Sequence, residues 1–268
     1  MTRTLRALPT LLRIGFADAV AYRAELVVWL LSTNMALVMM ALTTAVARSM
    51  PGGRIGGLGQ RDFVAYYLAT LVVRLVTGAW VLWEANMEIR QGTLAFRLLR
   101  PIHPLLHYAA ENVAAVPLRA AISLPILVIL LLTLGGDRVT HDPVLWAMFL
   151  VAVVGAWLIT FLAMSVIAAL AFYIDSVGSI GQIWFGLFTI LSGYILPLQM
   201  FPPWLGTLTR YLPVRYMLAF PVEVLIRMTP RRTALLELGI QWSFVAALAL
   251  AARGAWRAGI RRYSAFGG

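Results

Sequence analysis

Six apolar segments in this chain are long enough to cross a lipid bilayer, and they constrain the fold more than any other feature. A membrane-spanning helix needs roughly 20 apolar residues to cross about 30 Å of hydrocarbon. The composition agrees, since 61% of the 268 residues are hydrophobic and only 12% are charged. The sequence therefore predicts an all-α integral membrane protein, a single domain over residues 1–268 with six transmembrane helices. The expected spans are 26–47, 63–83, 113–134, 144–172, 181–200 and 235–252.

Missing residue types exclude several kinds of chemistry. All 22 basic residues are arginine, and there is no cysteine. A chain without lysine has no P-loop lysine and no Schiff base, and one without cysteine has no thiol nucleophile and no thiolate metal ligand. His103 and His107 have the spacing of two zinc ligands on a helix, but no glutamate follows His103 and Pro104 lies between them. We therefore expect no catalytic residue, metal site or cofactor in this chain.

Residues 1–25 have the pattern of a helix that lies in the lipid headgroup layer. Apolar residues recur at helical spacing on one face, and arginines and a threonine lie on another. A cleaved signal peptide is the competing interpretation, but the apolar run that follows is too long for one and lacks a small-residue cleavage site. The two faces are Leu5, Leu8, Leu12 and Phe16 against Arg6, Thr10 and Arg13.

Polar residues inside the spans favour helices that pack inward or line a path. Ser32 and Asn34 lie within the first span, where lipid would leave their polar groups unpaired. Arg74 lies near the centre of the second span, a position that costs roughly 2.5–3.5 kcal/mol unless the side chain finds a partner or water. Both an interhelical contact and a role in transport remain open for it. For Arg119 we expect a side chain that reaches the interface beside Glu111.

Residues 201–234 do not form an ordinary loop. Prolines divide this segment into pieces of a few helical turns, and the longest apolar piece, from Tyr216 to Ile226, is too short to cross a bilayer. The pattern predicts short helices that enter the outer interface, return and cap the bundle, with a loose amphipathic loop on the lipid surface as the alternative. Without this segment, the arginines favour both termini on the cytoplasmic side.

Residues 84–104 form a charged island between the second and third spans. Arginines recur there at helical spacing and predict a basic stripe, with apolar residues on another face. Gly92 allows a bend, while Pro101 and Pro104 end the helix. Periodicity alone fits an anchor that lies along the membrane. The stripe is Arg90, Thr93, Arg97 and Arg100, and the apolar face is Met87, Leu94 and Leu98.

Two strings and their order relative to the spans resemble a known family. IRQGTLAFRLLRPIHP follows the second span, and LSGYILPLQMFPPWL leads out of the fifth, with RYLP further on. Together they resemble the permease subunit of type-2 ATP-binding-cassette (ABC) exporters, in a small six-span branch related to drug and viologen exporter permeases. The resemblance covers essentially the whole chain.

This resemblance implies a role for each unusual segment. It makes 84–104 a cytoplasmic coupling helix that contacts a separate ATPase subunit, and 201–234 a re-entrant segment over the exit. The implied ATPase contacts are Glu84, Arg90, Gly92, Leu94, Arg97, Leu98, Arg100 and Pro101. The implied outer cap includes Gly193, Pro197, Pro202 and Pro203.

The resemblance also implies partners and a location. The chain would pair with a second permease, the same or similar, in the inner membrane of a bacterium, surrounded by lipid and without a nucleic-acid partner. It would not be an enzyme by itself, because ATP and magnesium would bind to the ATPase. The alternative is a stand-alone secondary transporter or a non-catalytic membrane scaffold. The expected substrate path includes Ser32, Asn34, Met35, Arg74, Phe188 and Ser192.

Overall fold

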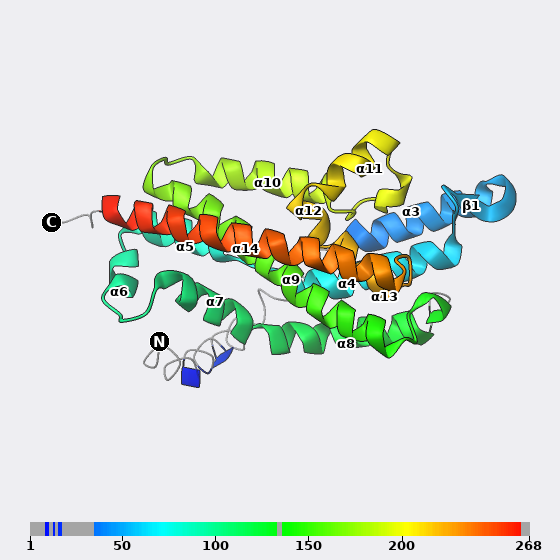
Figure 1. The fold of residues 1–268 in the computed structure, drawn as a ribbon, viewed down its shortest axis with the longest axis horizontal. Helices are drawn as coiled ribbons and strands as arrows, with labels where there is room; N and C mark the ends of the chain where they lie inside the picture. Colours follow the sequence, from blue (N-terminus) through cyan, green and yellow to red (C-terminus); the bar gives the residue numbers. More distant parts are fainter. Residues whose placement is uncertain (1–8, 11–12, 14–15, 18–34, 133–135, 264–268) are drawn as a thin grey trace.

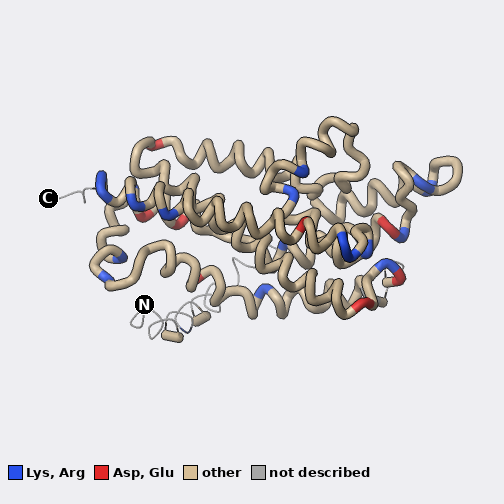
Figure 2. Tube along the Cα trace, viewed as in Figure 1, with Lys and Arg blue, Asp and Glu red and all other residues tan. Residues whose placement is uncertain are grey.

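A computed structural model shows an elongated bundle whose long helices run along one axis (Figure 1). The structure describes residues 9–10, 13, 16–17, 35–132 and 136–263. The predicted interfacial helix over 1–25 and the first part of the first predicted span lie largely outside these residues. Figure 2 shows that most charged residues lie toward the two ends of the bundle. That distribution is expected where a charge in hydrocarbon is costly.

Among the described residues, four helical stretches are long and apolar enough to cross a membrane, by length and composition. The first joins α4 to α5 and the second joins α7 to α8, so both are interrupted. The third consists of α9 and the 3-10 helix η3, and the fourth is α14. The bounds are Gln60–Thr77 for α4, Val81–Gln91 for α5, Pro104–Ala114 for α7, Val116–Leu132 for α8, Pro143–Ala168 for α9, Ala169–Phe172 for η3 and Arg231–Arg262 for α14.

Two shorter apolar helices overlap the first and fifth predicted spans. They are α3, Met35–Ser49, and α10, Val177–Leu191. Helix α10 ends well before the predicted limit at residue 200, because the chain turns at Gly193. The other four predicted spans overlap the four long stretches, so the expected helical membrane architecture holds while the number of crossings stays a prediction.

Helix α9 lies at the centre of the bundle and packs against α14, α13, α5 and α4. Helix α14 approaches α9 closely at Gly155 of α9, because glycine has no side chain there. A Cβ added to Gly155 would lie 2.7 Å from the side chain of Gln241 in α14. The buried Gln241 amide donates to the carbonyls of Ala152 in α9 and Tyr216 in α12, at 2.9 and 3.0 Å. Close backbone approach with interhelical hydrogen bonds is the usual packing mode of membrane helices.

The bundle has two distinct ends. At one, which we call the hairpin end, the strands β1 (Arg54–Ile55) and β2 (Leu58–Gly59) pair antiparallel between α3 and α4. The 3-10 helices η1 (Pro51–Gly53) and η2 (Gly136–Arg138) also lie there. At the other, which we call the C-terminal end, α14 finishes beside α5 and α6 (Figure 1).

The proline-rich segment after α10 folds back into the bundle. Prolines begin or precede three of its four short helices, as expected where no backbone N–H is needed. All seven residues of α13 are buried, and α13 packs on α9 and α4. A loose loop on the lipid surface is therefore wrong for this part of the segment. Its helices are η4 (Leu198–Met200), α11 (Pro203–Arg210), α12 (Pro213–Tyr216) and α13 (Ala219–Leu225).

The turn at Gly193 holds this segment in place. Gly193 has φ +86°, a left-handed conformation that side chains other than glycine rarely adopt. Its carbonyl accepts a hydrogen bond from the Tyr66 hydroxyl at 2.6 Å, and the Ile195 carbonyl accepts one from Tyr67 at 2.7 Å. A Cβ on Gly193 would lie only 2.5 Å from the Tyr66 oxygen. The turn thus requires glycine for both its conformation and its packing.

Replacing Gly193 by alanine should lower the thermal stability of the protein in detergent. The left-handed conformation costs about 1–2 kcal/mol and the lost Tyr66 hydrogen bond about 1 kcal/mol more. The matched control is Gly186→Ala in α10, where an added Cβ meets nothing within 4 Å. Equal unfolding temperatures for the two variants would contradict this role of the turn.

Candidate functional site

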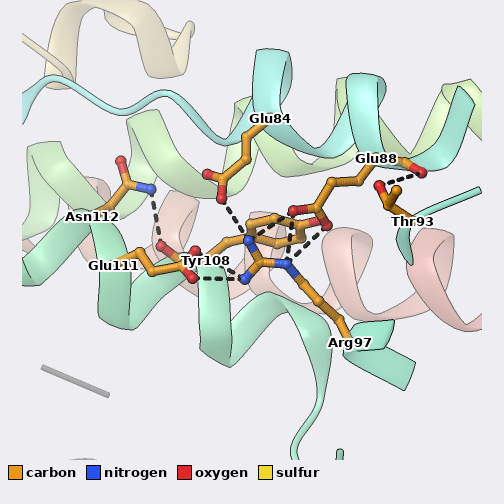
Figure 3. Close-up of polar contacts among 7 residues, drawn as sticks. All are labelled: Glu84, Glu88, Thr93, Arg97, Tyr108, Glu111 and Asn112. Carbon is orange, nitrogen blue, oxygen red and sulfur yellow. Dashed lines mark hydrogen bonds and ion pairs between the residues drawn. The ribbon is translucent and has the colours of Figure 1, made fainter. Parts of the chain in front are cut away.

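One arginine at the C-terminal end binds three carboxylates (Figure 3). Arg97 comes from α6 (Leu94–Leu98), Glu84 and Glu88 from α5, and Glu111 from α7. The guanidinium lies 2.7 Å from Glu84, 2.8 Å from Glu88 and 2.9 Å from Glu111. Glu84 and Glu88 are four residues apart, so both point from the same face of α5. We call these four residues the Arg97 cluster.

Aromatic and amide side chains of α7 complete the surroundings of the cluster. The Tyr108 ring lies 4.3 Å from the Arg97 guanidinium carbon, and its hydroxyl donates to Glu88 at 2.7 Å. One turn further, Asn112 accepts a hydrogen bond from the backbone N–H of Trp80, at the break between α4 and α5. Three helices are thereby tied together by charged and polar contacts.

Charge in the Arg97 cluster is unbalanced and partly shielded from water. The Arg97 side chain is 13% exposed. Burial by itself lowers the pKa of Arg97, but the hydrogen bonds to Glu88 and Glu111 outweigh burial and hold that pKa above its ordinary value. The carboxylates outnumber the guanidinium, so Arg97 is the cation that allows them to lie close together.

The predicted basic stripe over residues 84–104 is wrong. Gly92, with φ +76°, ends α5 in the left-handed conformation, and α6 starts as a separate helix. A single helical periodicity therefore does not extend across Gly92. Arg97 points inward to the cluster and Leu94 is fully buried, so neither is presented to a partner as expected. Leu98 is partly buried and packs against the same core as Leu94.

Other residues of this segment remain on the surface. Phe96 is 68% and Leu99 83% exposed, unusual values for large apolar side chains. Arg90, Arg100 and Pro101 are exposed as well. We call these five residues the α6 surface. Arg90, Arg100 and Pro101 were expected from the sequence as ATPase contacts, whereas Phe96 and Leu99 were not.

Two other parts of the chain reach the same end. The guanidinium of Arg90 donates to the Asp175 carbonyl at 2.9 Å, which joins α5 to the connector between α9 and α10. The Tyr263 hydroxyl donates to the Gly92 carbonyl at 2.7 Å, so the end of α14 holds the turn between α5 and α6. Residues far apart in the sequence thus form one face at the C-terminal end.

The residues expected along a substrate path are brought together only in part. The Arg74 guanidinium lies 4.9 Å from the centre of the Phe188 ring, which joins α4 to α10. Ser192 is buried directly after α10, while Met35 is 42% exposed at the start of α3. The predicted positions Ser32 and Asn34 lie outside the described residues.

Comparison with protein families identifies the family of this chain. A family model described as ABC-2 family transporter protein matches residues 31–267. The chain belongs to the ABC-2 transporter family. No curated protein matches it significantly. The protein is therefore a membrane-embedded permease component of an ABC transporter, which is a transport component and not itself catalytic, and its family implies an ABC ATPase as partner.

In this ABC-2 permease, Arg119 does not reach the interface as predicted. It is 4% exposed, and its guanidinium donates to the carbonyl of Gly78, where α4 ends. Its expected neighbour Glu111 binds Arg97 instead. The break at Gly78 leaves a carbonyl without a helical partner, and Arg119 satisfies that carbonyl from the neighbouring helix α8.

The four residues of the predicted outer cap lie at the start of helices or turns. Pro197 precedes η4, Pro202 precedes α11, and Pro203 is the first residue of α11. Gly193 makes the turn described above. Their roles in the fold follow from these positions, whereas a role over a substrate exit stays a prediction.

A second charged cluster in the permease was not predicted. Arg215 of α12 lies 2.8 Å from Glu223 of α13 and 3.5 Å from Glu237 of α14. The Tyr216 hydroxyl donates to Glu237 at 2.6 Å. Nothing in the sequence places Glu237 beside Arg215, since they lie on helices whose relative position depends on the fold.

Arg97→Gln should strongly destabilise the permease, because it leaves three neighbouring carboxylates without their cation. Removing one partner of a buried ion pair costs about 3–5 kcal/mol. We expect the low end of that range, since Glu84 and Glu111 keep 31% and 34% of their side chains exposed. Thermal unfolding in detergent measures the change.

The matched control for this variant is Arg100→Gln, an exposed arginine three residues away. Its effect should stay within about 0.5 kcal/mol, as for ordinary surface changes. If the two variants unfolded at the same temperature, the Arg97 cluster would have no special structural role.

Proposed function

We propose that this permease is the membrane component of an exporter and that its ATPase binds the α6 surface. The observation that carries the proposal is the pair of exposed side chains Phe96 and Leu99 on a segment that is held firmly from behind by Arg97. Large apolar side chains on a rigid surface favour a protein contact. Interfaces concentrate their binding energy in aromatic and arginine side chains, and Arg90 and Arg100 are available here.

The α6 surface is too small to bind an ATPase alone. Stable protein interfaces bury about 1,200–2,000 Å² in total. The connector after α9 adds Tyr173 and Ile174, which are 45% and 41% exposed. Exposed arginines at the end of α14 lie at the same end, including Arg261 and Arg262 (Figure 2). These segments together supply both apolar area and positive charge for an ATPase with an acidic, partly apolar groove.

The Arg97 cluster provides a route by which ATPase movement reaches the membrane. Arg97 binds carboxylates of α5 and α7, and these helices continue into α4 and α8. A displacement of α6 therefore moves both long stretches together instead of unwinding the short helix. ATP binding and hydrolysis in the partner would drive alternating access in this way.

We further propose that a second permease, the same or similar, covers α3 and α10. Both helices present large apolar side chains outward, and a path between two permeases needs two such faces. The hairpin end would be the outer side, with α11 to α13 as a re-entrant cap and both termini in the cytoplasm of a bacterium. The exposed residues concerned include Val38 and Leu42 on α3, and Ile183, Leu187 and Ile190 on α10.

Phe96→Asp and Leu99→Asp together should release the ATPase from the permease. The double variant replaces the exposed apolar contacts by charges but leaves Arg97 and its carboxylates intact. Co-purification of the ATPase with detergent-solubilised permease measures binding. We expect at least a tenfold loss of bound ATPase, which corresponds to about 1.4 kcal/mol.

Tyr211→Asp is the control for that experiment, because Tyr211 is 75% exposed but lies at the end of α11, away from the α6 surface. It should retain the ATPase. Undiminished binding by the double variant, with a normal unfolding temperature, would place the ATPase elsewhere.

Arg74→Met should keep the fold while changing transport. Methionine removes the charge but keeps an unbranched side chain that can still pack against the Phe188 ring. A guanidinium that faces the path would instead be needed for transport, so we expect substrate-stimulated ATPase activity of the reconstituted complex to fall. A lower unfolding temperature with normal stimulation would assign Arg74 to packing between α4 and α10.

A further inference from the structure

A cavity of about 500 Å³ lies among η4, α11, α13 and the start of α14. Its wall includes both carboxylates of the unpredicted cluster, Glu223 and Glu237, together with Arg215 and Arg210. The side chains of Arg215, Glu223 and Glu237 are 9%, 7% and 13% exposed, so these charges lie deep in the wall. No part of the proposed coupling to an ATPase uses this cavity.

The deep wall of the cavity carries more negative than positive charge. Two carboxylates share the single guanidinium of Arg215, and the longer of its two contacts, to Glu237, is 3.5 Å. Burial raises the pKa of Glu223, although Arg215 opposes the shift. An uncompensated buried carboxylate is costly, and a cation with hydrogen-bond donors would relieve that cost. The deep wall therefore favours a primary ammonium group.

Hydroxyl groups and a positively charged side chain line the cavity nearer the protein surface. Arg210 is exposed, and Thr207 and Thr233 also line the cavity. Arginine binds phosphate through two parallel hydrogen bonds, and a threonine hydroxyl such as that of Thr233 can donate to a phosphate oxygen. The Thr207 hydroxyl donates to the Pro203 carbonyl at 2.8 Å. The cavity thus presents a negative interior and a positive, hydroxyl-bearing mouth.

The two faces of α11 place this mouth at the level of the lipid headgroups. One face, with Pro203, Thr207 and Arg210, lines the cavity. The opposite face exposes Trp204, Leu208 and Tyr211, by 69%, 45% and 75%. Exposed tryptophan and tyrosine mark the membrane interface, where their rings meet both the acyl chains and the headgroups.

We propose that this cavity binds a phosphoethanolamine group, with its ammonium toward Glu223 and Glu237 and its phosphate toward Arg210. At this depth the source is the headgroup of phosphatidylethanolamine. A quaternary ammonium has no N–H to donate to the carboxylates, so phosphatidylcholine fits less well. Phosphatidylglycerol has no ammonium at all.

The test compares these three lipids, with identical acyl chains, on full-length permease that has been delipidated in detergent. Native mass spectrometry counts bound lipid, and the shift in unfolding temperature reports its effect. Phosphatidylethanolamine should bind at least about tenfold more tightly than the other two, the ratio expected from one hydrogen bond between charged groups. Equal binding of all three would overturn the proposal.

Soluble phosphoethanolamine distinguishes a free phosphoethanolamine group from a membrane lipid as the ligand of the cavity. If it competes with the lipid at millimolar concentration, the cavity recognises the headgroup itself. If it does not compete while the lipid preference persists, the acyl chains contribute and the site is a lipid site. If phosphoethanolamine binds to the permease and phosphatidylethanolamine does not, the membrane source is wrong.

Glu237→Gln should remove the preference for phosphatidylethanolamine, since an amide cannot neutralise an ammonium. The matched control is Asp137→Asn, an exposed carboxylate at the hairpin end that does not line the cavity. It should keep the preference. A Glu237→Gln protein that retains the preference contradicts the proposal.

A second variant tests the cavity if Glu237→Gln fails to fold. Thr207 is exposed, so Thr207→Phe narrows the mouth while leaving Arg215 and both carboxylates unchanged. This variant should lose most of the bound phosphatidylethanolamine at an unchanged unfolding temperature without lipid. Full binding by it would show that the lipid lies elsewhere.

Discussion

Hydrogen bonds from side chains to interrupted backbone are the constraint on which this bundle depends. Inside a membrane, a carbonyl that leaves a helix has no water to bind and must find a donor in the protein. At the end of α4, the Gly78 carbonyl accepts from Arg119. After α10, the Gly193 carbonyl accepts from Tyr66, and at the end of α12 the Tyr216 carbonyl accepts from Gln241. Each break thereby also fixes the position of a second helix.

The two charged clusters of the bundle combine the same residue types in different surroundings. Arg97 is enclosed by three carboxylates from two helices and by an aromatic ring, which makes the region around α6 rigid. Arg215 likewise binds two carboxylates, but these line a cavity. In the proposed mechanism the closed cluster would transmit displacement, whereas the cluster beside the cavity would leave charge for a ligand. The difference lies in packing and not in the residue types.

The sequence predicts the helices much better than it predicts what their charged residues contact. Length and hydropathy suffice for the long apolar stretches, and prolines indicate where the segment after α10 breaks. Helical periodicity failed at Arg97, because Gly92 starts a new helix with a different phase. The expectation that Arg119 reaches the interface was wrong for another reason, because the Gly78 carbonyl that it binds becomes available only once α4 breaks. Contacts between helices that are distant in the sequence are not encoded in local spacing.

Helix α10 has few buried residues compared with the helices at the centre of the bundle. Only Val177, Gly181 and Phe188 are buried among its fifteen residues, whereas α13 is buried throughout. Helix α10 begins after the connector whose Asp175 carbonyl accepts a hydrogen bond from Arg90. It ends at the Gly193 turn, whose carbonyl accepts a hydrogen bond from Tyr66. In the proposed cycle, displacement of α5 and α6 would therefore reach α10 through that connector. The contact between Arg74 and Phe188 lies along this same boundary, so movement there would change the surroundings of an arginine near the middle of a long apolar stretch.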